Sequence, residues 1–256
     1  MPPVVLKRVS VITVCYNSAS TIAAALQSVQ MQTWPEIEHI VIDGGSYDGT
    51  QDVITSHGAH VSRVVSERDD GIYDAMNKGL LLATGDVICF LNADDAYADD
   101  GVIARAVARM NQRCLDALYG DVVFFSPGDP DRVVRRYRSG PFTLRRLAWG
   151  WMPAHPALFM TANVYRRTGL FNTSYRLAGD YDYIIRVMLN GDVKAEHQAE
   201  VFVRMQAGGI STSGWRSKIL LNREVLRACR DNGLRTSLPK ILSKYPLKAL
   251  ELLLRR

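Results

Sequence analysis

The sequence predicts an α/β fold with a mainly parallel sheet flanked by helices. In the first 95 of the 256 residues, short and almost wholly apolar segments alternate with segments whose apolar residues recur at helical spacing. Apolar strands separated by helices are typical of parallel sheets that are covered on both faces. Ligands of such sheets bind outside the carboxyl ends of the strands, so the polar turn after each strand is a candidate binding site.

The elements of this first part follow in order. The expected strands are 9–14, 39–42, 61–65 and 86–91. The first expected helix carries Ile22, Leu26 and Val29 after a cap at Ser20, and the next two cover about 50–56 and about 73–83. Three polar turns then fall at the ligand-binding edge of the sheet: Tyr16-Asn17, 43–46 and 92–95.

The second part has a different pattern. We expect a helix over about 100–112, a hairpin of strands 117–125 and 133–137, a strand at 157–160, and an amphipathic helix that starts near Tyr181. No internal repeat or low-complexity linker interrupts the chain. One mixed α/β domain over 1–215 with a helical C-terminal extension over 216–256 accounts for this order.

Composition narrows the class of protein. Hydrophobic residues make up 47% of the chain and charged residues 22%, which is ordinary for a globular protein. No run approaches the roughly 18 apolar residues of a membrane span, and the first residues do not resemble a secretory signal. The four cysteines form no C-x-x-C pair. We therefore expect a reduced, cytoplasmic protein.

The formal net charge of +5 is concentrated near the C-terminus. Residues 237–256 contain five basic residues and one acid among many leucines. This basic amphipathic tail fits either peripheral contact with an anionic membrane surface or a docked terminal helix with solvated lysines. Basic residues interleaved with exposed aromatics are not found, so nucleic-acid binding is not expected.

Two adjacent carboxylates, Asp94 and Asp95, directly follow the expected strand 86–91. Like charges repel, and a buried carboxylate without a partner is costly. A divalent cation, Mg²⁺ or Mn²⁺, accepts one or two protein carboxylates together with substrate phosphates. The pair therefore suggests a cation site, and a plain polar loop is the alternative.

Two common phosphate-binding motifs are missing from the sequence. No G-x-G-x-x-G follows the first strand, and no G-x-x-x-x-G-K-[ST] occurs. Rossmann dehydrogenases and P-loop NTPases are therefore poor candidates. A nucleotide could instead be held by an acid such as Asp43 and by a metal at its diphosphate.

Four motifs in order resemble family 2 glycosyltransferases, which are inverting enzymes with the GT-A fold. They are V-S-V-I-T-V-C-Y-N-S at 9–18, V-I-D-G-G-S-Y-D-G-T at 41–50, S-E-R-D-D-G-I-Y-D-A-M-N-K-G at 66–79 and A-T-G-D-V-I-C-F-L-N-A-D-D at 83–95. Looser similarity continues to about residue 215. The third motif resembles the branch that builds bacterial exopolysaccharide, capsule or O-antigen units.

The resemblance implies roles on the donor side. Residues 9–95 would bind a nucleotide sugar, with Asp43 at the base, and Asp94 and Asp95 would lie at the metal and ribose-diphosphate position, Asp95 being the preferred metal ligand. Asn92 stands where the family often has a third acid, which weakens the expected metal site, and Lys78 is a candidate phosphate-facing cation. The other donor-binding residues implied are Thr13, Tyr16, Asn17 and Asn77.

On the acceptor side, residues 96–215, the resemblance implies that Asp180 is the catalytic base, with Asp182 as the alternative. The sequence itself places Asp180 at the N-cap of a helix, where the helix dipole stabilises a carboxylate by roughly 0.3–1 kcal/mol; a simple cap is the other interpretation. Acceptor or phosphate contacts are expected from His155 and from Gly208 and Gly209, although each also fits an ordinary loop.

The sequence therefore predicts an inverting, metal-dependent glycosyltransferase that uses a nucleotide-diphosphate sugar, most simply a UDP-sugar. The acceptor is expected to be a glycan or a polyprenyl-linked glycan at the inner face of the plasma membrane. Two alternatives remain open: a metal-dependent nucleotidyl- or phosphotransferase, and a non-catalytic protein that binds sugar nucleotides. The sugar, the base, the linkage and the oligomeric state are not determined by the sequence.

Overall fold

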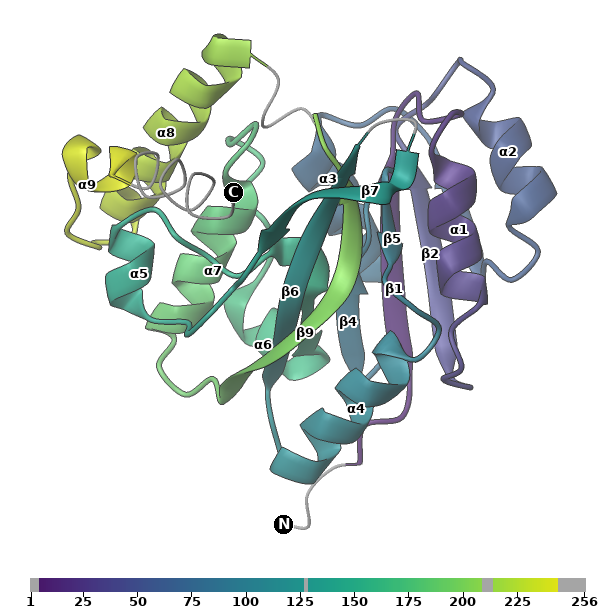
Figure 1. Cartoon of the computed structure of the whole chain (residues 1–256), viewed down its shortest axis with the longest axis horizontal. Helices are drawn as coiled ribbons and strands as arrows, with labels where there is room; N and C mark the ends of the chain where they lie inside the picture. Colours follow the sequence, from purple (N-terminus) through teal and green to yellow (C-terminus); the bar gives the residue numbers. More distant parts are fainter. Residues whose placement is uncertain (1–4, 127–128, 209–213, 244–256) are drawn as a thin grey trace.

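A computed structural model describes residues 5–126, 129–208 and 214–243 of the chain. Within these residues, nine strands form one mixed sheet in the order β3-β2-β1-β4-β8-β6-β9-β5, with β7 paired to β6 (Figure 1). The predicted α/β class is confirmed. The strands are β1 (Val9–Cys15), β2 (Ile37–Asp43), β3 (Arg63–Ser66), β4 (Val87–Phe90), β5 (Asp95–Tyr97), β6 (Ala117–Ser126), β7 (Asp129–Tyr137), β8 (Leu158–Thr161) and β9 (Ala195–Gln206).

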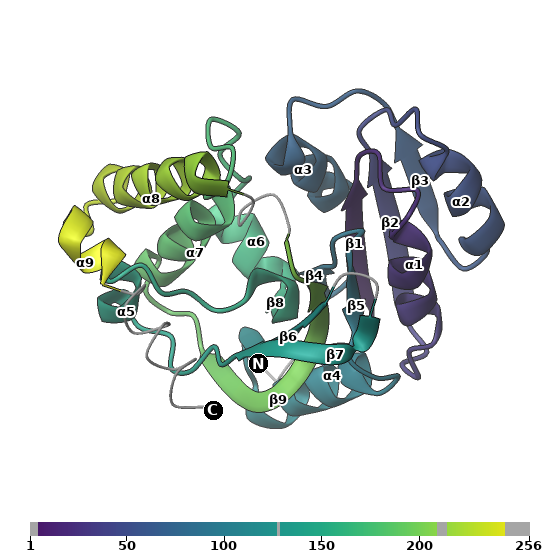
Figure 2. The same cartoon turned by 45° about the horizontal axis from the view of Figure 1, so that its top comes forward.

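The first four strands are mutually parallel, as predicted. Helices α1 (Ile22–Gln30) and α2 (Thr50–His57) cover one face of this part of the sheet, and α3 (Ile72–Leu82) covers the other (Figure 2). Side chains of β1 alternate between the two faces, as the pleat requires: Ile12 and Val14 belong to the apolar cluster that includes α3, whereas Cys15 packs in the cluster with α1 and α2.

The second part of the sheet is built on two long strands. β6 pairs in parallel with β9 and in antiparallel with β8, and β8 joins the first part by an antiparallel pairing with β4. The predicted hairpin is confirmed as β6 and β7. The sequence did not indicate β9 or the short β5, which extend the sheet. The helices here are α4 (Val102–Arg113), α5 (Leu144–Ala148), the 3-10 turn η1 (His155–Ala157), α6 (Ala162–Thr168) and α7 (Gly179–Leu189).

Two helices follow β9: α8 (Gly214–Asp231) and α9 (Leu238–Leu242). The predicted boundary between residues 215 and 216 falls inside α8, whose buried side packs with α7 in the main apolar cluster through Val225, Ala228 and Cys229. Of the tail 237–256, residues 244–256 lie outside the described part. Among the described residues, no helix is both long and apolar enough to cross a membrane.

Candidate active site

The turns that follow β1 and β2 form one connected surface at the carboxyl edge of the sheet. The parallel register sets Cys15 beside Asp43. The backbone N–H of Asn17 donates to Oγ of Ser46 (2.7 Å), and Oδ1 of Asn17 accepts from the N–H of Tyr47 (3.1 Å). Asn17 adopts a positive φ of 48°, which an Asn tolerates better than most residues. Asn17 thus connects the two loops.

Two exposed tyrosines stand on this surface. Tyr16 is 58% exposed and Tyr47 82% exposed, and their ring centroids lie 6.3 Å apart at an interplanar angle of 77°. Exposed aromatic faces are suitable for stacking on a nucleotide base. Tyr47 was not singled out from the sequence, because an exposed loop tyrosine carries no periodic signal.

Asp43 lies fully buried beneath this surface. Its carboxylate accepts hydrogen bonds from the backbone and hydroxyl of Ser46, from Oγ of Ser66 (2.6 Å) and from Nε2 of Gln51 (3.3 Å). These bonds hold the loop after β2. A nucleotide base that contacts Asp43 would have to add a hydrogen bond to this network or replace one of its donors. Contact between Asp43 and the nucleotide base therefore remains a prediction.

Thr13 is also fully buried, and its Oγ1 forms a hydrogen bond with Nε2 of His39 (2.9 Å). The Thr13 hydroxyl is therefore engaged on the side of the sheet that carries His39. The predicted role of Thr13 in lining the nucleotide pocket stays a prediction. While this bond is in place, only the backbone of Thr13 is free to contact a nucleotide.

The acid pair after β4 divides into an exposed and a buried member. Asp94 is exposed, whereas Asp95 is 2% exposed and accepts one hydrogen bond at Oδ2 from Nδ2 of Asn92 (3.1 Å). Oδ1 of Asp95 and Oδ1 of Asn92 are buried and have no partner among the described atoms. Burial, and then the charge of Asp94, raise the pKa of Asp95 well above its usual value, and partial desolvation also raises the pKa of Asp94.

These features fit a divalent cation. Hard cations prefer oxygen ligands, and Mg²⁺ uses one or two carboxylates together with phosphates. The unpartnered Oδ1 of Asp95 and the exposed carboxylate of Asp94 are such oxygens. A cation would also offset the repulsion between the two acids. No cluster of three or more metal-binding side chains occurs in the described residues, so substrate oxygens would have to complete the coordination.

The two donor-side residues predicted on α3 are already occupied by protein partners. The amide of Asn77 bonds both backbone groups of Phe171, donating to the carbonyl (2.9 Å) and accepting from the N–H (2.8 Å). Nζ of Lys78 contacts Oε1 of Glu67 (2.9 Å), the carbonyl of Arg68 (2.9 Å) and Oδ2 of Asp74 (3.5 Å). Asn77 therefore ties α3 to the second part of the chain, and both donor-binding roles remain predictions.

Asp180 lies in the first turn of α7 and is half-buried. Its Oδ1 accepts from the hydroxyl of Tyr73 (3.2 Å) and from the N–H of Tyr181 (2.8 Å). Tyr73 belongs to the first turn of α3, which begins at the carboxyl edge of the sheet beyond β3. The structure thus attaches Asp180 to the same edge as the turns described above. A Cβ at Gly179 would come within 2.7 Å of the Tyr73 ring, so this close packing depends on a glycine.

The prediction that Asp180 is an N-cap is wrong. The N-cap is Ala178, and Asp180 is the second residue inside α7. Its environment also acts against the expected stabilisation of the charged form. Burial is the largest influence and raises the pKa of Asp180 to about 6, outweighing the hydrogen bonds from Tyr181 and Tyr73 that favour the carboxylate. A carboxylate with this pKa is a stronger base than an ordinary aspartate.

Asp182, the alternative base, has both oxygens engaged. Oδ2 forms an ion pair with Nε of Arg186 (2.9 Å), and Oδ1 accepts from Nδ2 of Asn232 (2.8 Å). The residue is 3% exposed. These bonds join α7 to the segment after α8, so the observed contacts of Asp182 stabilise the fold.

His155 is buried against aromatic rings, stacked on Phe90 at 5.3 Å and edge-on to Phe171 at 5.9 Å. Burial lowers the pKa of His155 to about 4, so the ring is neutral near pH 7. Gly208 is exposed at a φ of +103°, which favours glycine, and Gly209 lies outside the described residues. The acceptor or phosphate contacts predicted for these residues are not tested by this geometry.

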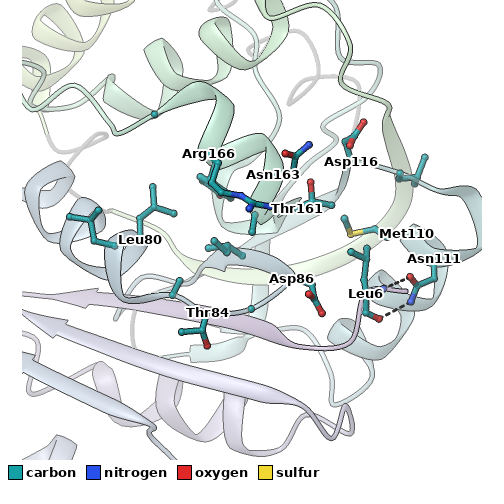
Figure 3. A pocket seen from close by; sticks show the side chains of 18 of the residues that line it. Leu6, Leu80, Thr84, Asp86, Met110, Asn111, Asp116, Thr161, Asn163 and Arg166 are labelled. Carbon is teal, nitrogen blue, oxygen red and sulfur yellow. Dashed lines mark hydrogen bonds between the residues drawn. The ribbon is translucent and has the colours of Figure 1, made fainter. Parts of the chain in front are cut away.

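A cavity of about 830 Å³ opens elsewhere, at the amino ends of β1 and β4 (Figure 3). Leu6 and Asp86 precede these strands, and Arg166 of α6 points toward the cavity. None of the predicted site residues lines it. Ligands of parallel sheets bind at the carboxyl edge, so we assign the candidate site to the carboxyl ends of the strands and not to this cavity.

Comparison with known proteins agrees with the resemblance found in the sequence. Residues 10–170 match the family model described as Glycosyl transferase family 2. A PGL/p-HBAD biosynthesis glycosyltransferase from Mycobacterium bovis is 32% identical over 209 residues, which cover 80% of this chain and 79% of the relative. The Escherichia coli enzyme WfaP, named as a UDP-Glc:alpha-D-GlcNAc-diphosphoundecaprenol beta-1,3-glucosyltransferase, is 27% identical over 84% of each chain.

Solved structures share the fold at low identity. Staphylococcus aureus TarS 1-349 in complex with UDP-GlcNAc superposes with a TM-score of 0.68 at 18% identity, covering 86% of this chain and 66% of that one. The chain spans only 40% of a longer TarS structure. The mannosyltransferase PcManGT from Pyrobaculum calidifontis, in complex with GDP-Man and Mn2+, gives 0.61 at 18% identity over 96% and 80% of the two chains. The chain belongs to glycosyl transferase family 2 and has the GT-A fold.

Proposed function

We propose that the protein is an inverting glycosyltransferase that moves a sugar from a nucleotide-diphosphate donor to a hydroxyl group of a glycan or lipid-linked acceptor. The observation that carries this proposal is Asp180, a half-buried carboxylate with a pKa raised to about 6 at the carboxyl edge of the sheet. General bases work best when their pKa lies near the working pH. Family membership supports sugar transfer in general; the donor, the acceptor and inversion are our proposal.

The donor is proposed to be a UDP-sugar bound by residues 9–95. Tyr16 and Tyr47 offer the exposed rings on which the base would stack, with Asn17 fixing the loops that carry them. UDP is favoured because one solved neighbour was determined with UDP-GlcNAc and one relative is named for UDP-Glc. The rest of the described chain up to residue 208 would contact the acceptor.

Asp94 and Asp95 are proposed to hold Mg²⁺ or Mn²⁺. Accessibility favours Asp94 as the first ligand, the reverse of the order preferred from sequence, because the carboxylate of Asp95 is almost fully buried. When bound, the cation would offset the charge that develops on the departing diphosphate. The structure of PcManGT with Mn2+ supports such a cation.

In the proposed mechanism, Asp180 accepts the proton of the acceptor hydroxyl. That oxygen attacks the anomeric carbon from the face opposite the leaving diphosphate, so the anomeric configuration inverts. Tyr73 orients the carboxylate through Oδ1, leaving Oδ2 without a protein partner among the described residues and able to take the proton. Positioning of the hydroxyl supplies much of the rate, because the nucleophile is otherwise ordinary.

The acceptor is proposed to be lipid-linked, since WfaP is named for a diphosphoundecaprenol acceptor. Contact of residues 237–256 with the inner face of the plasma membrane remains part of this proposal. In the described portion, Leu238 and Leu242 of α9 are 43% and 39% exposed. Deletion of 237–256 should reduce binding to anionic liposomes, and unaltered binding would exclude this attachment.

A panel of nucleotide sugars tests the donor proposal. Thermal unfolding should shift upward with one or a few UDP-sugars in the presence of Mg²⁺ or Mn²⁺, and the shift should disappear with a chelator, because a ligand that binds only the folded state stabilises it. No shift with any nucleotide would contradict the proposal. Binding without transfer to any acceptor would favour the non-catalytic alternative.

A further inference from the structure

Glu224 of α8 is a buried carboxylate that binds the chain just before the proposed base. It is 7% exposed. Oε1 accepts from the N–H of Arg176 (3.0 Å), and Oε2 accepts from the N–H groups of Leu177 (2.8 Å) and Ala178 (2.9 Å). Three successive backbone donors therefore converge on one side chain from a helix 46 to 48 residues away in sequence.

This arrangement fixes the start of α7. Ala178 is the N-cap of the helix and is fully buried, and its own side chain cannot accept a capping hydrogen bond. Glu224 of α8 instead accepts hydrogen bonds from the N–H groups of residues 176–178, which lead into α7. On the opposite side, the Tyr73 ring packs against Gly179. Asp180 follows directly, so its backbone is held between α3 and α8.

The charge of Glu224 also reaches Asp180. Two titratable side chains from packed elements influence Asp180: Tyr73 from α3, whose hydrogen bond lowers the pKa of Asp180, and Glu224 from α8, whose negative charge raises it. Burial remains the largest influence. Removal of the Glu224 charge should therefore lower the pKa of Asp180.

We propose that Glu224 is a positioning residue that holds Asp180 in its reactive place through the backbone of residues 176–178. This inference rests on the proposed role of Asp180 as the base. It gives α8 a part in the active site, although α8 follows the segment 10–170 that matches the family model. Contacts of this kind matter because a displacement of about 1 Å can cost roughly 10²-fold in rate.

The test is Glu224→Gln, which preserves shape but presents an amide NH₂ to backbone donors and removes the charge. Asp231→Asn is the matched control: Asp231 lies on the same helix and loses the same charge, but it bonds Tyr175 and not residues 176–178. The pKa of Asp180 is measured by NMR on protein with ¹³C-labelled aspartate carboxyls, with Asp180→Asn identifying the resonance. Transfer is measured from UDP-glucose, or from whichever UDP-sugar stabilises the protein.

In Glu224→Gln, we expect kcat to fall about 10²-fold with little change in donor KM, and the pKa of Asp180 and the acid limb of the pH–rate profile to move down together. Asp231→Asn should match the wild type. If Glu224→Gln does not fold, Glu224→Asp serves instead: it keeps the charge but withdraws the carboxylate, so kcat should fall while the raised pKa persists. An unchanged kcat and an unchanged pKa of Asp180 in the folded variant would overturn the inference.

The proposed function fails in a different way. If Asp180→Asn retains full transfer, Asp180 is not the base, and a lowered pKa of Asp180 in Glu224→Gln would then support only the structural link. If Asp180→Asn abolishes transfer but Glu224→Gln behaves as the wild type, the base assignment stands and this inference is wrong.

Discussion

Two carboxylates, Asp43 on the proposed donor side and Asp180 on the proposed acceptor side, have opposite environments. Asp43 is fully buried and accepts hydrogen bonds from four residues: Ser46, Gln51, Ser66 and the thiol of Cys15. Asp180 has two hydrogen-bond donors, and burial raises its pKa to about 6. The saturated carboxylate stabilises a loop, whereas the poorly compensated one keeps its affinity for a proton. The group that we propose as the base is thus the one with fewer hydrogen-bond donors.

Among the substitutions proposed here, Asp180→Asn should have the largest effect on sugar transfer. Because an amide cannot accept the proton, we expect transfer to fall by about 10²–10⁴-fold, while UDP-sugar binding is retained. Steady-state kinetics and isothermal titration of the donor measure the two quantities.

Asp182→Asn is the control for that result. Asp182 is buried and paired with Arg186 and Asn232, so its substitution should lower the melting temperature with only a secondary effect on kcat. A larger loss of kcat in Asp182→Asn than in Asp180→Asn would move the base to Asp182.

The acid pair sharpens the comparison from the donor side. Asp94→Asn removes the exposed carboxylate and should leave the fold intact. The apparent affinity for a UDP-sugar with Mn²⁺, obtained from the thermal shift, should fall by at least tenfold. Asp95→Asn should weaken binding less and leave the melting temperature equal or higher, because it relieves a buried charge. Thermal unfolding with and without chelator measures both. A larger loss of donor affinity in Asp95→Asn than in Asp94→Asn would reverse the assignment and make Asp95 the first ligand.

The exposed tyrosines should give a smaller effect. Tyr47→Ala removes a ring that contacts only Tyr16 among the described aromatic residues, so donor affinity should fall by about 1 kcal/mol with kcat unchanged. Tyr16→Phe, which keeps the ring, is the matched control and should bind like the wild type. An unchanged donor affinity in Tyr47→Ala would show that Tyr47 does not stack on the nucleotide base.

The smallest effect is on stability. The pKa of Asp180 is about 6 in the folded protein against an ordinary value of 3.8, so the folded state binds more protons between these pH values. The free energy of unfolding therefore falls as pH rises from about 4 to about 6. Asp180→Asn does not titrate, so it should be more stable than the wild type at pH 8, on the order of 1 kcal/mol, with the difference vanishing near pH 4. Urea unfolding at the two pH values measures this.

Local pattern was enough to predict the parallel strands and the turns after them, because apolar runs and their polar ends are properties of neighbouring residues. β9 was missed because apolar and polar residues do not alternate regularly over Ala195–Gln206. The N-cap of α7 was predicted at Asp180, two residues after its observed place at Ala178. The raised pKa of Asp180 could not be predicted, because it depends on burial beside Tyr73 and Glu224, which are distant in sequence. The bonds of the Asn77 amide to the backbone of Phe171 could not be predicted either, because the two residues are distant in sequence, and the donor-binding role of Asn77 stays a prediction.

The anomeric configuration of the product tests the central claim most directly. The ¹H NMR coupling constant of the anomeric proton, recorded on early product formed from an α-linked UDP-sugar, reports that configuration. A single displacement assisted by Asp180 predicts a β-linked product from the wild-type enzyme. An α-linked product would contradict the account, because retention cannot arise from one attack opposite the leaving diphosphate.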